Sequence, residues 1–389
     1  MKILMLAPPP HLKGPLPKHT PHLVAALRAL GCEVVTEVWG RHHDVESLGT
    51  KVFGRVGDIW RVRRALHRER PDVLVVKTSH DWNTLLRDVP LLLVAGARAP
   101  RIVVQMHGSQ PETLTRAGQR LFAGFSRRLL SLCDAVMLLS SDERRQWEQF
   151  YPEGKFVVVA NPFVGAPQKP AGDAPDVSRA LAGVPPGAPL LLFVGRLIPG
   201  KGIFGLLDAV AELDASTPWH LLVAGEGEAG ARVAERVRAL GLEGRVTLAG
   251  YLRGDALDAA YRAATVFALP TWWMEGFPTV IAEAMGAGLP IVTTPIRGIA
   301  DHLKDGVNAV FVPPRDRDAL RDALRRVLGD ASLRASMAAA NREAVEKFAP
   351  AVVGRDYLAA LTDVVRQPPR RGQRGLRAAT SRMSAQRPL

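Results

Sequence analysis

The sequence predicts an α/β protein with two Rossmann-like domains, each a doubly wound parallel sheet covered by helices. Three observations predict this class. Short apolar runs rich in Val, Ile and Leu alternate with stretches of helical periodicity, as in parallel sheets whose crossovers are helices. The alternation occurs twice, on either side of a proline-rich segment. At 389 residues, 47% of them hydrophobic, the chain exceeds the size that one core usually serves.

The first domain is expected over residues 1–165. Its opening run, MKILMLAPPP, is too short for a signal peptide and predicts a buried first strand. Helical periodicity appears at residues 22–30 and 59–70. Further strands are expected at residues 33–38, 73–77, 102–106, 135–139 and 156–159, after the first at 3–7.

Prolines and glycines crowd residues 162–189, which predicts a linker over 166–189. The second domain follows over residues 190–350, with a last helix over 351–366. The remainder, 367–389, is arginine-rich without apolar periodicity, and we expect it to be disordered. Strands are expected at 190–194, 220–224, 245–248 and 266–269, and helices at 203–213, 229–240, 256–263 and 331–348.

Cysteine use and hydropathy suggest where the protein acts. Cys32 and Cys133 lie far apart and outside any C-x-x-C pair, which favours a reducing compartment. No window reaches the roughly 18 uncharged apolar residues of a membrane span. We therefore expect a cytoplasmic protein, free or peripheral at the inner membrane face. The net charge of +13 lies mostly in the first half and the tail, where an acidic partner would bind.

Two carboxylates stand out in the stretch PTWWMEGFPTVIAEAMGAGLPIVTTP, residues 270–295. If a helix starts near Thr279, Glu275 lies in the loop before it and Glu283 one turn inside. Both could then face one ligand at a helix N-terminus, which suits a ligand that carries phosphate and hydroxyl groups. The alternative is an ordinary buried helix that packs against the sheet.

Two cations follow the strand expected at 190–194, in the run from Gly195 to Gly202 that contains Arg196 and Lys201. The planar guanidinium and the compact ammonium could together neutralise a diphosphate leaving group. The spacing is not that of a Walker A loop. Ordinary turn chemistry is the alternative when this run is taken alone.

The two runs, in this order, closely resemble the G-R-x4-K-G and E-x7-E motifs of retaining, GT-B-fold glycosyltransferases of family 4. The resemblance covers about residues 1–366. It implies two domains facing a cleft, with the last helix bracing the first domain. It also assigns Gly195, Arg196 and Lys201 to the donor diphosphate, Glu283 to the ribose hydroxyls and Glu275 to the donor sugar.

The same resemblance implies further contacts with the donor. Backbone N–H groups of Gly276, Phe277 and Thr279 would reach its oxygens, while Pro278 has no N–H to offer. Glu226 lies in a G-x-G turn beside the nucleotide, and Tyr251 and Leu252 in the segment along the base. In the first domain it places His107 near the transferring carbon of the donor sugar and Gly14 near the diphosphate.

The loop of Gly14 departs from the family pattern because it holds one glycine among five prolines. Prolines cannot donate N–H groups, so we expect Lys13 or Lys18 to take part of the charge.

Two other patterns have structural and functional interpretations. Asp316-Arg317-Asp318 resembles a metal-binding D-x-D signature, but its place after two prolines favours a helix cap, and we predict no catalytic metal. A helix expected over 113–132 would carry Arg116, Arg120 and Arg127 on one edge and apolar residues, including Leu121, on the other. It is either a core-facing helix with a solvated back or a docking surface for an anionic membrane.

The sequence thus predicts transfer of a hexosyl-type sugar, with retention, from a nucleotide diphosphate sugar such as a UDP- or GDP-sugar. The acceptor is a hydroxyl of a glycan, a lipid-linked molecule or a small molecule, in polysaccharide, glycolipid or other glycoconjugate synthesis. A GT-B-like nucleotide-sugar epimerase is the alternative. Nucleic-acid binding is a distant third, because no basic stripe is interleaved with aromatic residues.

Overall fold

The computed structural model describes residues 1–12, 14–40, 42–43, 48–95, 98–163, 181, 183–214 and 218–369, without the side chains of 15 and 48–53. The chain forms two compact units. Unit 1 comprises Met1–Pro162 and Pro350–Leu389, and unit 2 comprises Phe163–Ala349. Lys13, most of the expected linker and all but the first residues of the expected tail lie outside the described residues.

Unit 1 contains a six-stranded sheet in the order β2-β1-β3-β4-β5-β6, with every pair parallel. Its chain topology reverses direction between β1 and β3, which are hydrogen-bonded neighbours. The strands are β1 (Lys2–Ala7), β2 (Glu33–Val38), β3 (Val73–Thr78), β4 (Ile102–Met106), β5 (Ala135–Leu138) and β6 (Phe156–Val158).

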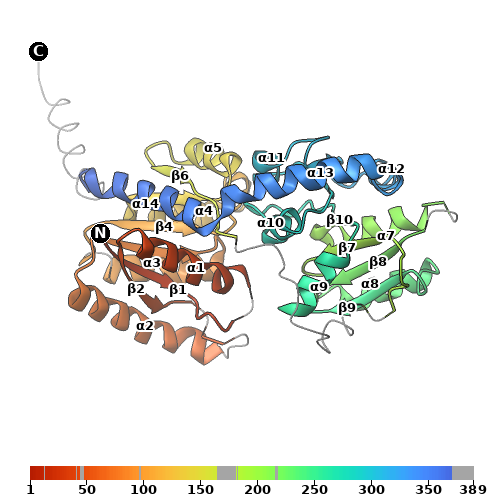
Figure 1. The fold of residues 1–389 in the computed structure, drawn as a ribbon. Helices are drawn as coiled ribbons and strands as arrows, with labels where there is room; N and C mark the ends of the chain where they lie inside the picture. The colour runs from red at the N-terminus through yellow and green to blue at the C-terminus, as the bar shows by residue number, and fades with distance from the viewer. Residues whose placement is uncertain are drawn as a thin grey trace, which may run out of the picture. The chain divides into compact units, whose positions relative to one another are not determined.

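Helices cover both faces of this sheet, as Figure 1 shows. Ile3 and Met5 of β1 pack with residues of α1 and α14, whereas Leu4 and Leu6 pack with residues of α2, α3, α4 and α5. Side chains therefore alternate between two apolar cores, which explains the near-continuous apolar runs of the strands. The helices are α1 (Pro15–Ala29), α2 (Leu48–Glu69), α3 (Trp82–Val94), α4 (Arg120–Leu132), α5 (Ser141–Phe150) and α14 (Pro350–Arg366), with a 3-10 turn at Pro111–Thr113.

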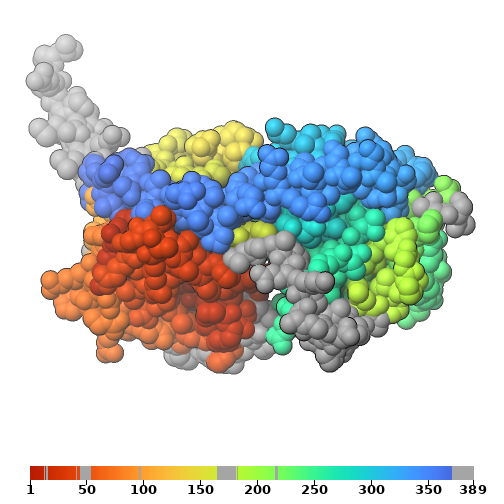
Figure 2. Space-filling view, in the orientation of Figure 1, coloured from red at the N-terminus to blue at the C-terminus, as the bar shows by residue number. Residues whose placement is uncertain are grey.

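Helix α14 belongs to unit 1 although it follows unit 2 in the sequence. It lies against α1, and the Tyr357 hydroxyl donates a 3.0 Å hydrogen bond to the buried Gln105 side chain of β4 (Figures 1 and 2). Gly354 brings the two helices close, since a Cβ there would lie 2.9 Å from that of Ala26. The chain thus returns to the first sheet to complete its core.

Three helix starts in unit 1 differ from the prediction. Helix α2 begins at Leu48, well before the periodicity noted at 59–70. Helix α1 begins at Pro15, not near residue 22, because prolines in a first turn replace N–H groups that have no intrahelical partner. Helix α4 begins at Arg120, not at 113, after a turn in which Gly118 has a φ of 85°. For Leu121, the core-facing alternative was wrong. This side chain is 74% exposed, because Phe122, Ser126, Leu129 and Leu130 form the buried face.

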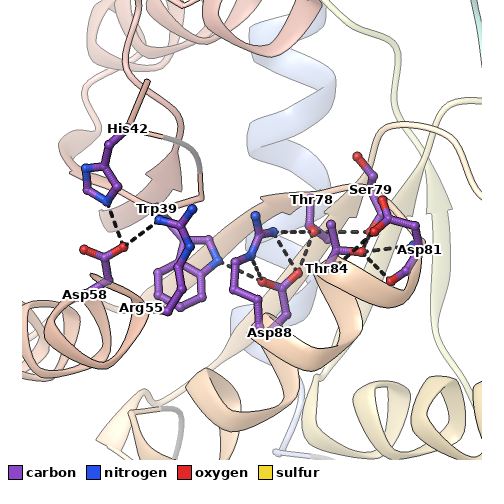
Figure 3. Close-up of polar contacts among 10 residues, drawn as sticks. Trp39, His42, Arg55, Asp58, Thr78, Ser79, Asp81, Thr84 and Asp88 are labelled. Carbon is purple, nitrogen blue, oxygen red and sulfur yellow. Dashed lines mark hydrogen bonds and ion pairs between the residues drawn. The ribbon is translucent and has the colours of Figure 1, made fainter. Parts of the chain in front are cut away.

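A buried polar network holds the carboxyl ends of β2 and β3 (Figure 3). Asp88 of α3 accepts hydrogen bonds from the Trp39 indole at 2.8 Å, from the Thr78 hydroxyl and from Arg87 at 2.7 Å. Asp58 of α2 likewise accepts from His42 and Arg55. These buried carboxylates are compensated, which fixes the strand ends rigidly.

Unit 2 contains a second six-stranded parallel sheet, in the order β12-β11-β10-β7-β8-β9. This is the strand order of a dinucleotide-binding Rossmann fold, with the reversal between β7 and β10. The strands are β7 (Leu190–Val194), β8 (His220–Ala224), β9 (Val246–Gly250), β10 (Val266–Leu269), β11 (Ile291–Thr293) and β12 (Ala309–Phe311).

The helices of unit 2 connect these strands and extend beyond them. Helix α12 packs against α7 and α13, and α10 packs against α13. None of the helices in the described parts of the chain combines the length and apolarity needed to cross a bilayer. The helices are α7 (Ile203–Ala211), α8 (Gly230–Ala239), α9 (Asp255–Ala263), α10 (Thr279–Gly286), α11 (Gly298–His302), α12 (Arg317–Gly329) and α13 (Ala331–Ala344), with 3-10 turns at Pro199–Lys201 and Val345–Phe348.

Candidate active site

The two motifs of unit 2 meet where its sheet changes direction. The cation-bearing loop follows β7, the loop of Glu275 follows β10, and the two strands are neighbours with Leu192 in register with Phe267. In open parallel sheets the crevice beyond the carboxyl ends of such strands is the usual ligand site. The topology therefore brings together Lys201 and Glu275, which lie 74 positions apart in sequence.

One carbonyl ties the two loops to each other. The Gly200 oxygen accepts hydrogen bonds from the backbone N–H groups of Trp272 and Trp273, at 2.8 and 2.9 Å, and from the Thr271 hydroxyl at 3.2 Å. Gly202 then takes a φ of 80°, and a Cβ there would lie 2.1 Å from the Pro270 oxygen. Only glycine fits this contact, so the loop after β7 is positioned by backbone atoms.

Lys201 and Glu275 form an ion pair across the two loops. The Lys201 side chain is almost buried, at 7% exposure, whereas that of Glu275 is 26% exposed. A cation held so deeply needs a compensating anion. Glu275 supplies it in the described structure, and its carboxylate borders the solvent.

Glu283 lies one turn inside α10, which begins at Thr279 as predicted. It is 7% exposed, and its carboxylate accepts a 2.8 Å hydrogen bond from the hydroxyl of Tyr261 on α9. Burial, the nearby charge of Glu283 and this bond raise the pKa of Tyr261 well above its usual value. Tyr261 therefore stays a neutral donor and orients the carboxylate.

The remaining predicted nucleotide contacts are mostly on the surface. Arg196 and Glu226 are exposed, and Tyr251 is 44% exposed, while Leu252 is half-buried. Gly225 passes so near Gly195 that a Cβ would lie 1.8 Å from the Gly195 oxygen. The turns after β7 and β8 are thus packed backbone to backbone, with Arg196 and Glu226 directed outward.

The segment between Glu275 and Glu283 is held by contacts with α11 and with Phe348. Gly276 accepts a 2.8 Å hydrogen bond from the N–H of Gly298 at the start of α11, and the Phe277 ring stacks on Phe348 at 5.1 Å. Pro278 directly precedes α10 with φ −65° and ψ 125°, so it gives the chain its entry angle into the helix.

The predicted site residues of unit 1 lie at the carboxyl edge of its own sheet. His107 directly follows β4, and both of its ring nitrogens are buried without a hydrogen-bond partner among the described residues. Burial and the charge of Lys77 lower the pKa of His107 well below the usual range, so the ring is neutral at pH 7. Gly14 directly precedes α1 with a φ of 129°.

The D-x-D run serves as a helix cap, as predicted. The Asp316 carboxylate accepts a 2.9 Å hydrogen bond from the N–H of Ala319 in the first turn of α12. Asp318 pairs with Arg321 on the exposed face of that helix.

Sequence reasoning missed two residues near these sites. Tyr261 appeared only as part of a helical pattern, and its bond to Glu283 spans 22 positions. Lys77 lies within the apolar run predicted as the strand at 73–77, and a lysine in such a run is the signal that marks it.

Comparison with known proteins assigns each half of the chain to a domain family. Residues 16–162 match the model of the glycosyl transferase 4-like domain, and residues 177–344 match that of glycosyl transferases group 1. Together the two models span most of the chain.

Individual proteins agree with this result. The chain is 28% identical to D-inositol 3-phosphate glycosyltransferase of Nocardia farcinica over 74% of its own length, and it spans 65% of that relative, less than two thirds. The structure is similar to sucrose-phosphate synthase of Thermosynechococcus elongatus, with a TM-score of 0.74, 19% identity and coverage of 93% and 98% of the two chains. It is also similar to Anabaena HepE in complex with UDP-glucose, with a TM-score of 0.71, 19% identity and coverage of 93% and 100%.

The motif order, the two parallel sheets and the matches to both domain models converge on one class of enzyme. The chain belongs to the GT4-type glycosyltransferases with the GT-B fold.

Proposed function

We propose that this enzyme transfers a sugar, with retention at the anomeric carbon, from a nucleotide diphosphate sugar to an acceptor hydroxyl. The observation that carries the proposal is the Lys201–Glu275 ion pair at the β7/β10 switch point of unit 2. A nearly buried ammonium opposite a partly exposed carboxylate offers one group for a diphosphate and another for sugar hydroxyls.

The position of each residue in unit 2 suggests which part of the donor it binds. Lys201 and the exposed Arg196 bind the diphosphate and stabilise its charge as the glycosidic bond breaks. Glu283, oriented by Tyr261, accepts hydrogen bonds from the two ribose hydroxyls, and Glu275 accepts from hydroxyls of the sugar. The backbone of residues 276–279 at the start of α10 adds N–H donors. HepE, a structural neighbour, binds UDP-glucose, which supports a donor of this class.

Retention follows from same-face attack in this proposal. The acceptor hydroxyl approaches from the side of the departing diphosphate, whose oxygen takes the acceptor proton. Arg196 and Lys201 take the place of a metal ion, so EDTA should leave transfer unchanged. The neutral His107 contributes a hydrogen bond to the donor sugar rather than a charge.

Unit 1 binds the acceptor, and its surface suits a lipid-linked acceptor at an anionic membrane. On α4 the exposed Leu121 stands beside exposed Arg120 and Arg128, and the 43% exposed Trp82 packs on Phe125 at 5.8 Å. Apolar side chains flanked by arginines are typical of helices that bind the surface of a bilayer. The enzyme would then act at the inner membrane face in polysaccharide or glycolipid synthesis.

The experiment that tests the donor class is a panel of UDP- and GDP-sugars scored by thermal stabilisation, followed by titration with UDP and UMP. Arg196→Ala should weaken UDP binding at least tenfold and UMP binding much less, because UMP lacks the second phosphate. Arg238→Ala is the matched control, since it removes an exposed arginine from the far end of α8. Absence of stabilisation by every donor, or equal losses for UDP and UMP, would overturn the proposal.

A further inference from the structure

A lysine that has no acidic partner among the described residues lies buried in unit 1. The Lys77 side chain, on β3, is 2% exposed, and its only hydrogen bond among the described residues is a 3.4 Å contact with the Thr20 hydroxyl. Burial alone lowers the pKa of Lys77 to about 7. An unpaired ammonium in such a place is costly, which favours a ligand as its missing counterion.

Its position in the sheet is that of a ligand site. Leu6 of β1 pairs with Val76, so Lys77 lies beside the last residue of β1, where the strand order of unit 1 reverses. This is the switch point of the first sheet, equivalent to the one that carries Lys201 in the second. The next residue, Thr78, is held by Asp88, so the strand end is rigid (Figure 3).

The groups around Lys77 are polar and neutral. The charge of Lys77 acts on His19 of α1 and on His107 after β4, and with burial it lowers the pKa of both, that of His19 to about 3. Thr20 faces Lys77 from α1, and Tyr357 of α14 bonds to Gln105, the register partner of Lys77. No carboxylate faces Lys77 from these elements in the described structure. His107, which directly follows β4, is partly exposed, whereas Lys77, His19 and Thr20 are buried.

The start of α1 explains why a side chain is needed for an anion here. Pro15 and Pro17 occupy the first and third positions of the helix, and neither has an N–H group. The helix end therefore lacks two of the donors that usually bind an oxyanion. Lys77 can replace them with a full charge.

We propose that Lys77 is an oxyanion-binding residue of unit 1, whose ammonium holds a phosphate-type group of a substrate. The proposal rests on the proposed transfer function for the origin of that group. The oxyanion comes either from the donor diphosphate or from a phosphate on the acceptor, and the two sources share the same chemistry.

The test uses the full-length enzyme, calorimetry and two probes, sulfate and UDP. Sulfate is a tetrahedral oxyanion that does not titrate between pH 6 and 9. Lys77→Met replaces the cation with an apolar side chain, and Lys77→Gln replaces it with a neutral polar one. Lys155→Met is the control, since Lys155 pairs with Asp363 on the surface of unit 1.

The outcomes separate the two sources. For an acceptor phosphate, sulfate binds the wild type with UDP present, both Lys77 variants weaken it at least tenfold, and UDP affinity changes less than twofold. For the donor diphosphate, both variants weaken UDP at least tenfold and UMP little, and sulfate competes with UDP. If neither probe responds to either variant, the proposal is wrong. If UDP fails to bind the wild type, the donor proposal fails while the sulfate measurement still tests Lys77.

The number of protons taken up on sulfate binding tests the same proposal with the wild-type enzyme alone. In the ligand-free enzyme the Lys77 amine is mostly neutral at pH 8, and a bound anion favours its charged form. Binding of sulfate should therefore take up close to one proton at pH 8 and almost none at pH 6. Comparing heats in buffers of different ionisation enthalpy gives this number. Equal uptake at both pH values contradicts the proposal.

Discussion

The hydroxyl of Tyr261 donates a 2.8 Å hydrogen bond to the carboxylate of Glu283, from a neighbouring helix and with both residues buried. This bond links α9 to α10 and fixes the direction of the acid that we assign to the ribose. Two substitutions should separate its structural role from its binding role.

Tyr261→Phe removes the donor and leaves a buried carboxylate short of one hydrogen bond, which costs about 1–3 kcal/mol of unfolding free energy. Glu283→Gln keeps an oxygen that can accept from Tyr261 and should be less destabilising, yet it should lower UDP affinity about tenfold. Urea denaturation and UDP titration of both variants make the comparison. Equal UDP affinity in Glu283→Gln and the wild type would remove Glu283 from the ribose site.

The Lys201–Glu275 pair predicts opposite effects of its two partners on UDP binding. Lys201→Met should weaken UDP binding by roughly 10- to 100-fold, because a charged hydrogen bond to phosphate contributes about 1.5–3 kcal/mol. Glu275→Gln should retain or strengthen UDP binding, since Lys201 loses its competing anion, but should nearly abolish sugar transfer. Weaker UDP binding in both variants would mean that the pair is only structural.

Lys77 predicts an unusual pH dependence of stability. Its pKa is about 7 in the folded chain and near 10.5 when unfolded, so the unfolded state binds more protons between these values and stability rises with pH across that window. The penalty is complete below pH 7 and can reach about 5 kcal/mol. Lys77→Met should therefore stabilise the enzyme at pH 6 and lose this advantage near pH 10. Denaturant unfolding at several pH values checks it, with Lys155→Met expected to track the wild type.

The surface of α4 predicts binding to anionic lipid. Flotation with vesicles containing phosphatidylglycerol should recover the enzyme, and vesicles of phosphatidylcholine alone should recover much less, because each arginine near an anionic surface contributes about 1 kcal/mol. Arg120→Ser/Arg128→Ser and Leu121→Ser should each reduce recovery. Arg144→Ser/Arg145→Ser on α5 is the control of equal charge. Recovery that is the same for both lipid compositions would exclude this surface as a docking site.

Local pattern predicted the motifs and most of the strands, although β11 and β12 were not predicted. The runs at 33–38, 102–106, 190–194, 220–224 and 266–269 coincide with β2, β4, β7, β8 and β10, because strands buried on both faces are continuous apolar runs. Helix α10 begins at Thr279, where the sequence analysis had placed a possible start. Helix starts were less predictable where a proline or glycine can lie either in a loop or at the start of a helix, as at α1 and α4.

The sequence by itself determined the two-sheet class and the order of the cation and acid motifs, since both depend on residues within one strand or one turn. Only the tertiary structure decided that Lys201 meets Glu275 and that Tyr261 orients Glu283. It also decided that Lys77 lies beside the end of β1 with no acid near it in the described part of the chain. The physical reason is that these relationships join residues distant in sequence through strand order and helix packing. Burial then fixes their charges, and neither strand order nor burial can be calculated from local periodicity.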